Sequence, residues 1–285
     1  VAALAEQDPS ERRDSPLLRM TESIIAMEER FGREAIPLVC SYLPEGAELD
    51  IPVHFTAFVP PRSFVMGGVV INVSAPYWKG NTDNILNNLA HELFHVGYSR
   101  RRPHRTEAPL HNEQLYGMLD SLQNEGTATW VGFQAAPDFP APDELDYGML
   151  ESPGEVTRLL AELNGLFARV GRVSEERLRR LSWDKGVTQR GYYIVGAHMA
   201  RTIESAQGRE ALVRTIGEGP ASFVRLYNAL VPEERRLRYV DAAAPAGDAG
   251  FSWERLFSPG RFGFVLVLVL ALAVLMIAIW IRARR

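Results

Sequence analysis

The chain has 285 residues, of which 46% are hydrophobic and 23% charged, the composition of a globular protein with a sizeable core. The formal net charge of -4 offers no basic face for phosphates, which excludes a nucleic-acid partner. The single cysteine, Cys40, excludes an intrachain disulfide and a cysteine-rich zinc site, so histidine and carboxylate side chains would have to hold any metal.

The first five residues, Val-Ala-Ala-Leu-Ala, end in the Ala-x-Ala pattern of a signal-peptidase cleavage site. We therefore interpret residues 1–10 as the remnant of an export signal and a short leader. A start inside a longer protein is the alternative. An export signal would place the domain that follows, at residues 11–240, outside the cytoplasm.

Within residues 11–240, the first predicted element is a helix from Pro16 to Phe31, which Gly32 is expected to end. Two β-branched and aromatic runs, Ile51–Val59 and Ser63–Val73, predict two or three strands. Helical periodicity then prevails, and it predicts helices over residues 84–98, 112–134, 154–170, 174–183, 188–206, 209–216 and 221–230. The expected fold class is α+β, with a small N-terminal mixed sheet next to a mainly helical body.

The helix predicted over residues 84–98 carries the sequence His91-Glu92-Leu93-Phe94-His95. Residues four apart share one helical face, so His91 and His95 can direct imidazole nitrogens at one Zn²⁺ ion. Glu92 would lie beside the ion, where its carboxylate can take a proton from zinc-bound water as that water attacks a carbonyl group. The motif therefore predicts a zinc-dependent hydrolase with Glu92 as its general base.

A catalytic zinc needs a third protein ligand and an open fourth position. Glu125, in the run Asn-Glu-Gly-Thr-Ala at 124–128, lies on the next predicted helix, which can fold back against the first. The motifs at 91–95 and 124–128 resemble the gluzincins, the thermolysin-like clan of zinc peptidases, especially bacterial members with Asn-Glu-Gly-x-Ala on the second helix. The resemblance implies a zincin-like catalytic domain, Glu125 as the third ligand, and peptides or proteins as substrates.

Other third ligands remain open. The longer metzincin motif is excluded, because its third histidine would stand six residues after His95, where this chain has Arg101. The rivals of Glu125 near the motif are Glu113, Glu107, His104 and His111.

One position departs from the gluzincin pattern. In thermolysin-like enzymes an acidic residue four after the ligand glutamate often orients a zinc-bound histidine, and here that position is Thr129. Other polar side chains on the two helices are therefore expected to hydrogen-bond the histidines. These are Asn87, Asn88, Asp120 and Asn124.

The helix predicted over residues 188–206 is expected to supply a hydrogen-bond donor for the oxyanion of the tetrahedral intermediate. Its Tyr-x-x-Gly-x-x-Met pattern at 193–199 resembles the downstream helix of gluzincin-like families, where the tyrosine faces the zinc. This implies Tyr193 as the donor, with His198 as a second candidate and Gly196 allowing a close approach between helices. Ordinary helix packing is the other interpretation.

Substrate contacts are less specific in the sequence. The run from Val69 to Val73 matches the gluzincin strand on which an extended peptide is laid, so it is expected to be the substrate-binding edge. His54, in the preceding strand, is interpreted as structural. Arg190 and Arg201 could bind a substrate carboxylate, but arginine is common in this chain and neither is assigned a role.

Near the C-terminus, residues 262–281 are an uninterrupted run of uncharged, almost wholly apolar residues. As a helix this run would be about 30 Å long, the thickness of a bilayer core. We expect a flexible linker at 241–260, a transmembrane helix at 261–282 and, by the positive-inside rule, a basic cytoplasmic tail at 283–285. A tail-anchored cytosolic protein and a processed sorting signal are the alternatives.

Together these features predict a single-pass, membrane-anchored zinc metallopeptidase with its catalytic domain outside the cytoplasm. The alternative is a non-catalytic, zinc-stabilised binding domain at the cell surface. Glu92 argues against this alternative, because a structural zinc site needs no base and usually closes all four coordination positions.

Overall fold

The computed structural model describes residues 22, 24, 25, 28, 31–47, 49–56, 63–65, 67–72, 82–101, 113–135 and 145–239. All of them belong to the first of the chain's two units, Val1–Ala243. The predictions for residues 1–10, 241–260, 261–282 and 283–285 concern residues outside this description. Within the described part, no helix is both long enough and apolar enough to cross a membrane.

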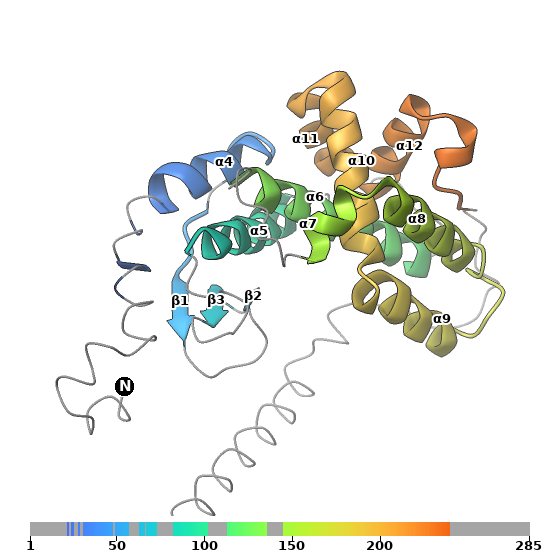
Figure 1. Cartoon of the computed structure of the whole chain (residues 1–285), viewed down its shortest axis with the longest axis horizontal. Coiled ribbons are helices and arrows are strands. Elements are labelled where there is room, and N and C mark those ends of the chain that lie inside the picture. Colours follow the sequence, from blue (N-terminus) through green and yellow to red (C-terminus); the bar gives the residue numbers. More distant parts are fainter. Residues whose placement is uncertain are drawn as a thin grey trace, which may run out of the picture. The chain divides into compact units, whose positions relative to one another are not determined.

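Three short strands form a small mixed sheet, as predicted, and their order is β1-β3-β2 (Figure 1). They are β1 (Val53–Thr56), β2 (Ser63–Val65) and β3 (Val69–Asn72). β1 runs parallel to β3 and β2 antiparallel to it. The prediction that β3 forms the substrate-binding edge is wrong, because β3 is hydrogen-bonded on both sides. The edges among the described strands are β1 and β2.

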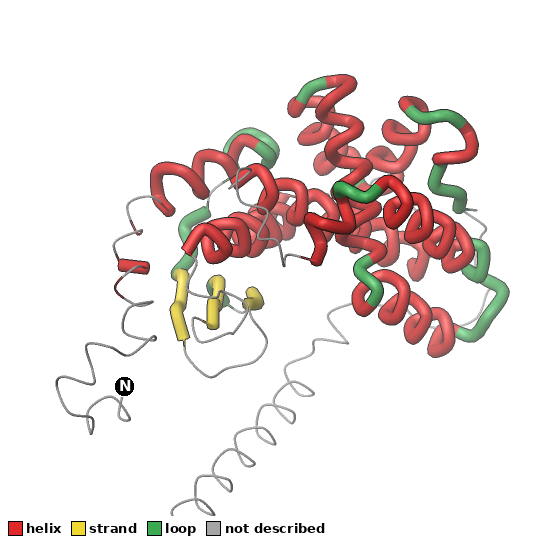
Figure 2. The backbone as a smooth tube through the Cα atoms, viewed as in Figure 1, coloured by secondary structure: helices red, strands yellow, loops and turns green. Residues whose placement is uncertain are grey.

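Helices make up most of the described residues beyond the sheet, so the predicted α+β class with a helical body is confirmed (Figure 2). Every helix predicted from residue 84 onward is present, with its ends shifted by a few residues. The helices are α4 (Ile36–Ser41), α5 (Thr82–Arg101), α6 (Glu113–Ala135), α7 (Leu145–Leu150), α8 (Pro153–Phe167), α9 (Glu175–Ser182), α10 (Gly191–Gln207), α11 (Arg209–Glu218) and α12 (Pro220–Leu230), with shorter turns η1 (Phe31–Ala35), η3 (Trp183–Thr188) and η4 (Glu233–Arg235). α7 was not predicted from the sequence.

The predicted helix end at Gly32 is wrong. The π-helical turn η1 includes Gly32 and continues directly into α4, which ends at Ser41. Phe31, Ala35 and Val39 are spaced four residues apart and are all buried in the core. Burial of this apolar face outweighs the weak helix preference of one glycine.

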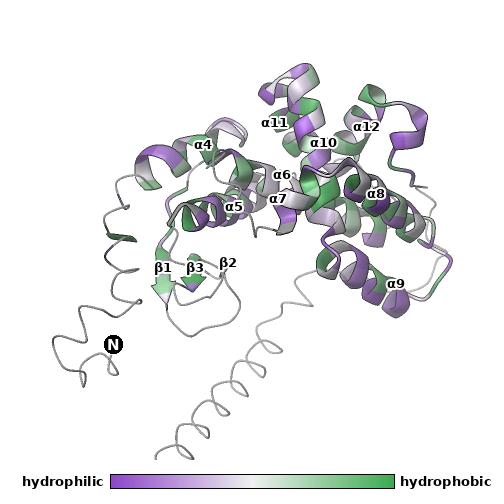
Figure 3. Cartoon of the chain, in the orientation of Figure 1, coloured by the Kyte–Doolittle hydropathy of each residue, from purple (hydrophilic) through white to green (hydrophobic). Residues whose placement is uncertain are grey.

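α9 illustrates how the charged residues of the helical body lie on exposed faces. α9 is largely hydrophilic (Figure 3), because its first turn carries Glu175 and Glu176 and its last turn Arg179 and Arg180. This arrangement places acidic groups at the positive end of the helix dipole and basic groups at the negative end. Only Leu178 and Ser182 of α9 are buried, so the helix covers the core with a narrow face.

The closest helix packing joins α6 to α10, and it fixes the position of Glu125. Gly126 and Gly196 face each other, and a Cβ atom added at Gly126 would lie 2.2 Å from the Gly196 Cα. Both residues must therefore lack a side chain for the helices to approach this closely. α6 also packs against α5 (Figure 1), so it connects the helix of the histidine motif with the helix that carries Tyr193.

We expect Gly196→Ala to lower the free energy of unfolding by about 1–3 kcal/mol, the usual cost of overpacking. The new Cβ would lie 2.2 Å from the Leu122 carbonyl oxygen and 2.6 Å from the Gly126 Cα, and backbone atoms cannot move aside as a flexible side chain can. Urea denaturation measures the change. Gly165→Ala on α8 is the matched control: nothing lies within 4 Å of its Cβ position, so better helix propensity should stabilise the protein by up to about 1 kcal/mol. Equal effects at both positions would contradict the close approach.

Candidate metal centre

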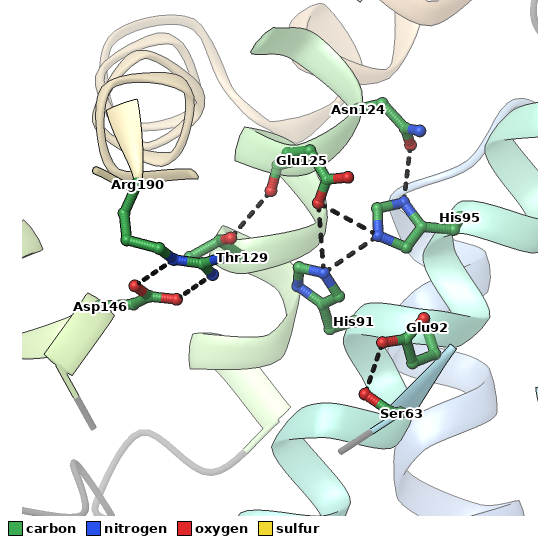
Figure 4. A network of polar contacts seen from close by, with 9 residues as sticks. All are labelled: Ser63, His91, Glu92, His95, Asn124, Glu125, Thr129, Asp146 and Arg190. Atoms are coloured by element: carbon green, nitrogen blue, oxygen red, sulfur yellow. Dashed lines mark hydrogen bonds and ion pairs between the residues drawn. The ribbon is translucent and has the colours of Figure 1, made fainter. Parts of the chain in front are cut away.

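The two motif histidines and Glu125 come together between α5 and α6 (Figure 4). His91 and His95, one helical turn apart on α5, direct their Nε2 atoms at each other across 3.0 Å. Glu125 of α6 approaches them with Oε2, at 3.6 Å from His91 Nε2 and 3.4 Å from His95 Nε2. The structure therefore joins all three residues that the sequence proposed as metal ligands.

The spacing of these atoms fits a tetrahedral zinc ion. With ligand distances near 2.0 to 2.1 Å, two ligand atoms of a tetrahedral site lie roughly 3.3 Å apart. The three observed separations, 3.0, 3.4 and 3.6 Å, bracket that value. Two imidazole nitrogens and one carboxylate oxygen form the donor set of a catalytic zinc, which leaves the fourth position open. Among the described residues this is the one group of three such side chains close enough to hold an ion.

Asn124 orients His95. The Asn124 Oδ1 lies 2.9 Å from His95 Nδ1, and because an amide oxygen can only accept, the Nδ1–H of His95 donates. With the Nδ1–H bonded to Asn124, Nε2 is the nitrogen that faces Glu125 and His91 and that would give up its proton to bind a metal. Asn124 is one of the residues expected from the sequence to orient a histidine, and its side chain lies at that position.

The electrostatics of the cluster favour an ionised Glu125. Burial opposes the charged form of His95, but the negative charge of Glu125 outweighs burial and raises the pKa of His95 to about 9. Burial also opposes ionisation of Glu125, yet the two histidines hold the pKa of its carboxyl well below the usual range. Glu125 is therefore a carboxylate at neutral pH, which is the form that binds a metal.

Glu92 follows His91 on α5 and is 8% exposed. Its Oε1 accepts a hydrogen bond of 2.7 Å from the Ser63 hydroxyl, at the start of β2 (Figure 4). Ser63 was not among the predicted site residues, because a serine in a predicted strand has no distinguishing feature. Through this bond the edge strand of the sheet is joined to the carboxylate beside the metal centre.

Tyr193 lies beside the cluster at the start of α10. Its ring is nearly parallel to that of His91, with an angle of 8° between the planes and 6.2 Å between the centroids. Burial and the charge of Glu125 raise the pKa of Tyr193, although the positive charge of Arg190 opposes them. The hydroxyl therefore keeps its proton at neutral pH and is able to donate a hydrogen bond.

His198, the second candidate for that donor, lies elsewhere. It packs edge-to-face against Tyr227 of α12, with 6.0 Å between the ring centroids. Five residues along a helix correspond to a rotation of about 140°, so His198 and Tyr193 lie on different faces of α10. Burial, with the charges of Arg201 and Arg235, lowers the pKa of His198 to about 4. Its neutral ring belongs to the packing between α10 and α12.

The other polar residues proposed around the histidines have other partners or none. The Thr129 hydroxyl donates to the Glu125 backbone carbonyl at 2.8 Å, and Asn87 Nδ2 donates to the Gly132 carbonyl at 2.8 Å. Asp120 accepts from Tyr98 at 2.9 Å. The buried Asn88 Oδ1 has no hydrogen-bond partner within the described part of the chain. Of these residues, Asn124 alone has a described hydrogen bond to a motif histidine.

Of the rival third ligands, Glu113 lies at the first position of α6. It is twelve residues before Glu125, a separation of about 18 Å along a helix, which places it far from the histidines. His104, Glu107 and His111 lie outside the described residues. Glu125 is therefore the third ligand for which the described geometry provides evidence.

Comparison with known proteins agrees with this geometry. No curated protein and no solved structure matches the chain significantly. One protein family does match, and it does so over residues 16–235, which include the metal centre and every described element of the helical body. Because the match covers well over half of the chain, the protein belongs to the family described as "Putative zinc dependent peptidase (DUF5700)".

Proposed function

We propose that the protein is a zinc-dependent peptidase of the gluzincin type, with the ion held by His91, His95 and Glu125. The observation that carries the proposal is the tetrahedral spacing of these three ligand atoms, with Glu92 next to His91 on the same helix. The ligand side chains are 15–26% exposed, so a small solute can reach them. A site closed on all four sides would be typical of a structural zinc instead.

When bound, zinc would polarise the scissile carbonyl group and lower the pKa of an attacking water molecule. Glu92 would take the proton from that water and later deliver it to the departing amine. The Ser63 hydroxyl, by donating to Glu92 Oε1, would hold the carboxylate in one orientation. Tyr193 would donate a hydrogen bond from its hydroxyl to the oxyanion of the tetrahedral intermediate, a role that its protonated state supports.

We propose β2 as the strand along which an extended peptide binds. It is an edge strand of the described sheet, and its first residue, Ser63, bonds the proposed general base. A peptide that pairs with β2 through backbone hydrogen bonds would lie beside Glu92 whatever its side chains are. β1, the other described edge, is separated from β2 by the width of β3.

The proposed function predicts peptide hydrolysis by the full-length protein loaded with one zinc ion per chain. A chelator should remove the activity, and one equivalent of Zn²⁺ should restore it, because the third ligand and the base are intact without metal. Mass spectrometry of a peptide library before and after incubation measures the cleavage. A zinc-loaded protein that cleaves no peptide would contradict the proposal.

The membrane anchor is also a proposal, supported by the apolar run at residues 262–281. We propose that this run holds the peptidase domain at the outer face of a membrane, with the basic segment 283–285 on the cytoplasmic side. Alkaline washing of membranes from expressing cells tests it: an anchored chain stays in the pellet, and release into the wash contradicts the anchor.

A further inference from the structure

A strained arginine borders the metal centre. Arg190 precedes α10 and has a φ of 65°, the left-handed region, and it is the one non-glycine residue among those described with a positive φ. Glycine adopts this conformation freely, whereas a side chain with a Cβ atom makes it unfavourable. The Arg190 side chain makes no capping hydrogen bond to α10. Interactions of this side chain elsewhere must therefore hold the strained backbone in place.

Asp146 of α7 grips the Arg190 guanidinium in a two-pronged ion pair (Figure 4). Nε donates to Asp146 Oδ1 at 2.8 Å, and Nη2 donates to Oδ2. Asp146 is 7% exposed, and a buried charge needs a partner of opposite sign. The ion pair with Arg190 compensates the charges of both side chains. This pairing argues against Arg190 as a receptor for a substrate carboxylate, one of the uses that the sequence left open.

The same guanidinium covers the ring of Tyr193. Its central carbon lies 3.2 Å from the ring centroid, and the ring in turn is nearly parallel to that of the metal-site residue His91. Asp146 therefore fixes Arg190, Arg190 fixes the plane of Tyr193, and Tyr193 stands beside a proposed zinc ligand. A planar guanidinium can hold a ring in this way, and a lysine ammonium cannot, because it is a compact point charge.

We propose that Arg190 is a positioning residue that holds the Tyr193 hydroxyl where the oxyanion forms. The proposal rests on the proposed function, in which Tyr193 is the oxyanion donor. In this role Arg190 acts through the tyrosine ring, which its guanidinium covers. The strained backbone fits this role, because in this conformation the guanidinium lies over the ring and bonds Asp146 at the same time.

The first test is a double-mutant cycle on peptide hydrolysis by the zinc-loaded, full-length protein. Tyr193→Phe should lower kcat by about 100-fold, the cost of one lost oxyanion donor. Arg190→Lys should lower kcat by about 10- to 100-fold, because a misplaced hydroxyl loses most of its effect, with KM within about two-fold of wild type. In the Tyr193→Phe background, Arg190→Lys should cost nothing further. Two losses that multiply in the double variant would overturn the proposal.

A second measurement does not depend on hydrolysis. With ¹³C-labelled tyrosine, the Tyr193 ring signal is assigned by its loss in Tyr193→Phe and then followed in Arg190→Lys without metal. The signal should shift or broaden by more than its line width, because the guanidinium no longer covers the ring. Arg201→Lys changes a partly buried arginine of α10 that pairs with Glu151; it is the control and should leave the signal in place. An unmoved signal in Arg190→Lys overturns the positioning role, whereas an inactive wild type overturns only the proposed function.

If Arg190→Lys fails to fold, Arg190→Gly combined with Asp146→Asn replaces it. Glycine accepts the φ of 65°, and the asparagine leaves no unpaired buried charge. A purely structural role for Arg190 predicts that this relaxed variant keeps the wild-type kcat and Tyr193 signal. The positioning role predicts the same fall in kcat and the same signal change as in Arg190→Lys.

Discussion

Replacing Glu92 with glutamine should abolish most peptide hydrolysis while one zinc ion per chain stays bound. Glutamine has the shape of glutamate but cannot take a proton from water, so the general-base contribution of about 10²- to 10⁴-fold is lost. In the wild-type protein the Ser63 hydroxyl donates to Glu92 Oε1 at 2.7 Å. The amide oxygen of the glutamine can still accept this hydrogen bond. The packing at the start of β2 should therefore be unchanged. Measurements of kcat/KM and of the zinc content of the purified protein test both parts of the prediction.

A matched exchange elsewhere separates the chemistry from a general loss of charge. Glu151→Gln removes the same charge at a 56% exposed side chain that pairs with Arg201, and it should leave kcat/KM within about two-fold of wild type. Equal turnover by the Glu92→Gln and wild-type proteins would remove Glu92 from the chemistry. It would then favour the alternative that the sequence left open, a zinc-stabilised domain that binds a partner without cleaving it.

The cluster of candidate metal ligands was predictable because its geometry is largely local. His91 and His95 are four residues apart, and helical periodicity alone puts them on one face. Glu125 belongs to a neighbouring helix, but the run Asn-Glu-Gly around it also contains the two residues that the site needs beside the ligand. Asn124 orients His95, and Gly126 lets α6 approach α10. Three neighbouring residues of one short motif therefore make tertiary contacts: Asn124 with His95, Glu125 with both histidines, and Gly126 with Gly196.

The residues that surround these ligands were not predictable, because they come from distant segments of ordinary composition. Ser63 is 29 residues from Glu92, and nothing in the strand pattern distinguishes it from other serines. Asp146 is 44 residues from Arg190 and lies on α7, a six-residue helix too short to show an apolar period. Contacts of this kind depend on how the helices pack, which a periodic pattern does not specify.

The place of β3 in the sheet and the place of His198 on α10 differ in how far the sequence determines them. The central place of β3 depends on strand order, and order within a sheet is not contained in the pattern of any single strand. The different places of Tyr193 and His198, by contrast, follow from helical periodicity. A residue five positions after Tyr193 is rotated by about 140° from it, and the structure accordingly places His198 against Tyr227.

Replacing Glu125 with alanine should lower zinc affinity by more than about 100-fold, beyond the 10- to 100-fold cost typical of losing a residue that merely orients a ligand. Two imidazoles remain, and two ligands hold zinc far less tightly than three. α6 itself should stay folded, because the Thr129 hydroxyl bonds the backbone carbonyl of residue 125 and not its carboxylate. Competition with a chromogenic zinc chelator measures the affinity, and circular dichroism confirms the helix content.

Two further variants on α6 should lose less zinc affinity than Glu125→Ala. Asn124→Ala removes the bond that orients His95 and should weaken zinc binding by about 10- to 100-fold, less than Glu125→Ala. Glu113→Gln removes the carboxylate at the first position of the helix, about 18 Å away along its axis, and should leave zinc affinity unchanged. The expected loss of zinc affinity is therefore largest at Glu125, a proposed ligand, smaller at Asn124, which orients a ligand, and absent at Glu113, which is remote. If Glu125→Ala binds zinc as tightly as wild type, the third ligand is another residue, and the connection between α5 and α6, with His104, Glu107 and His111, is where it should be sought.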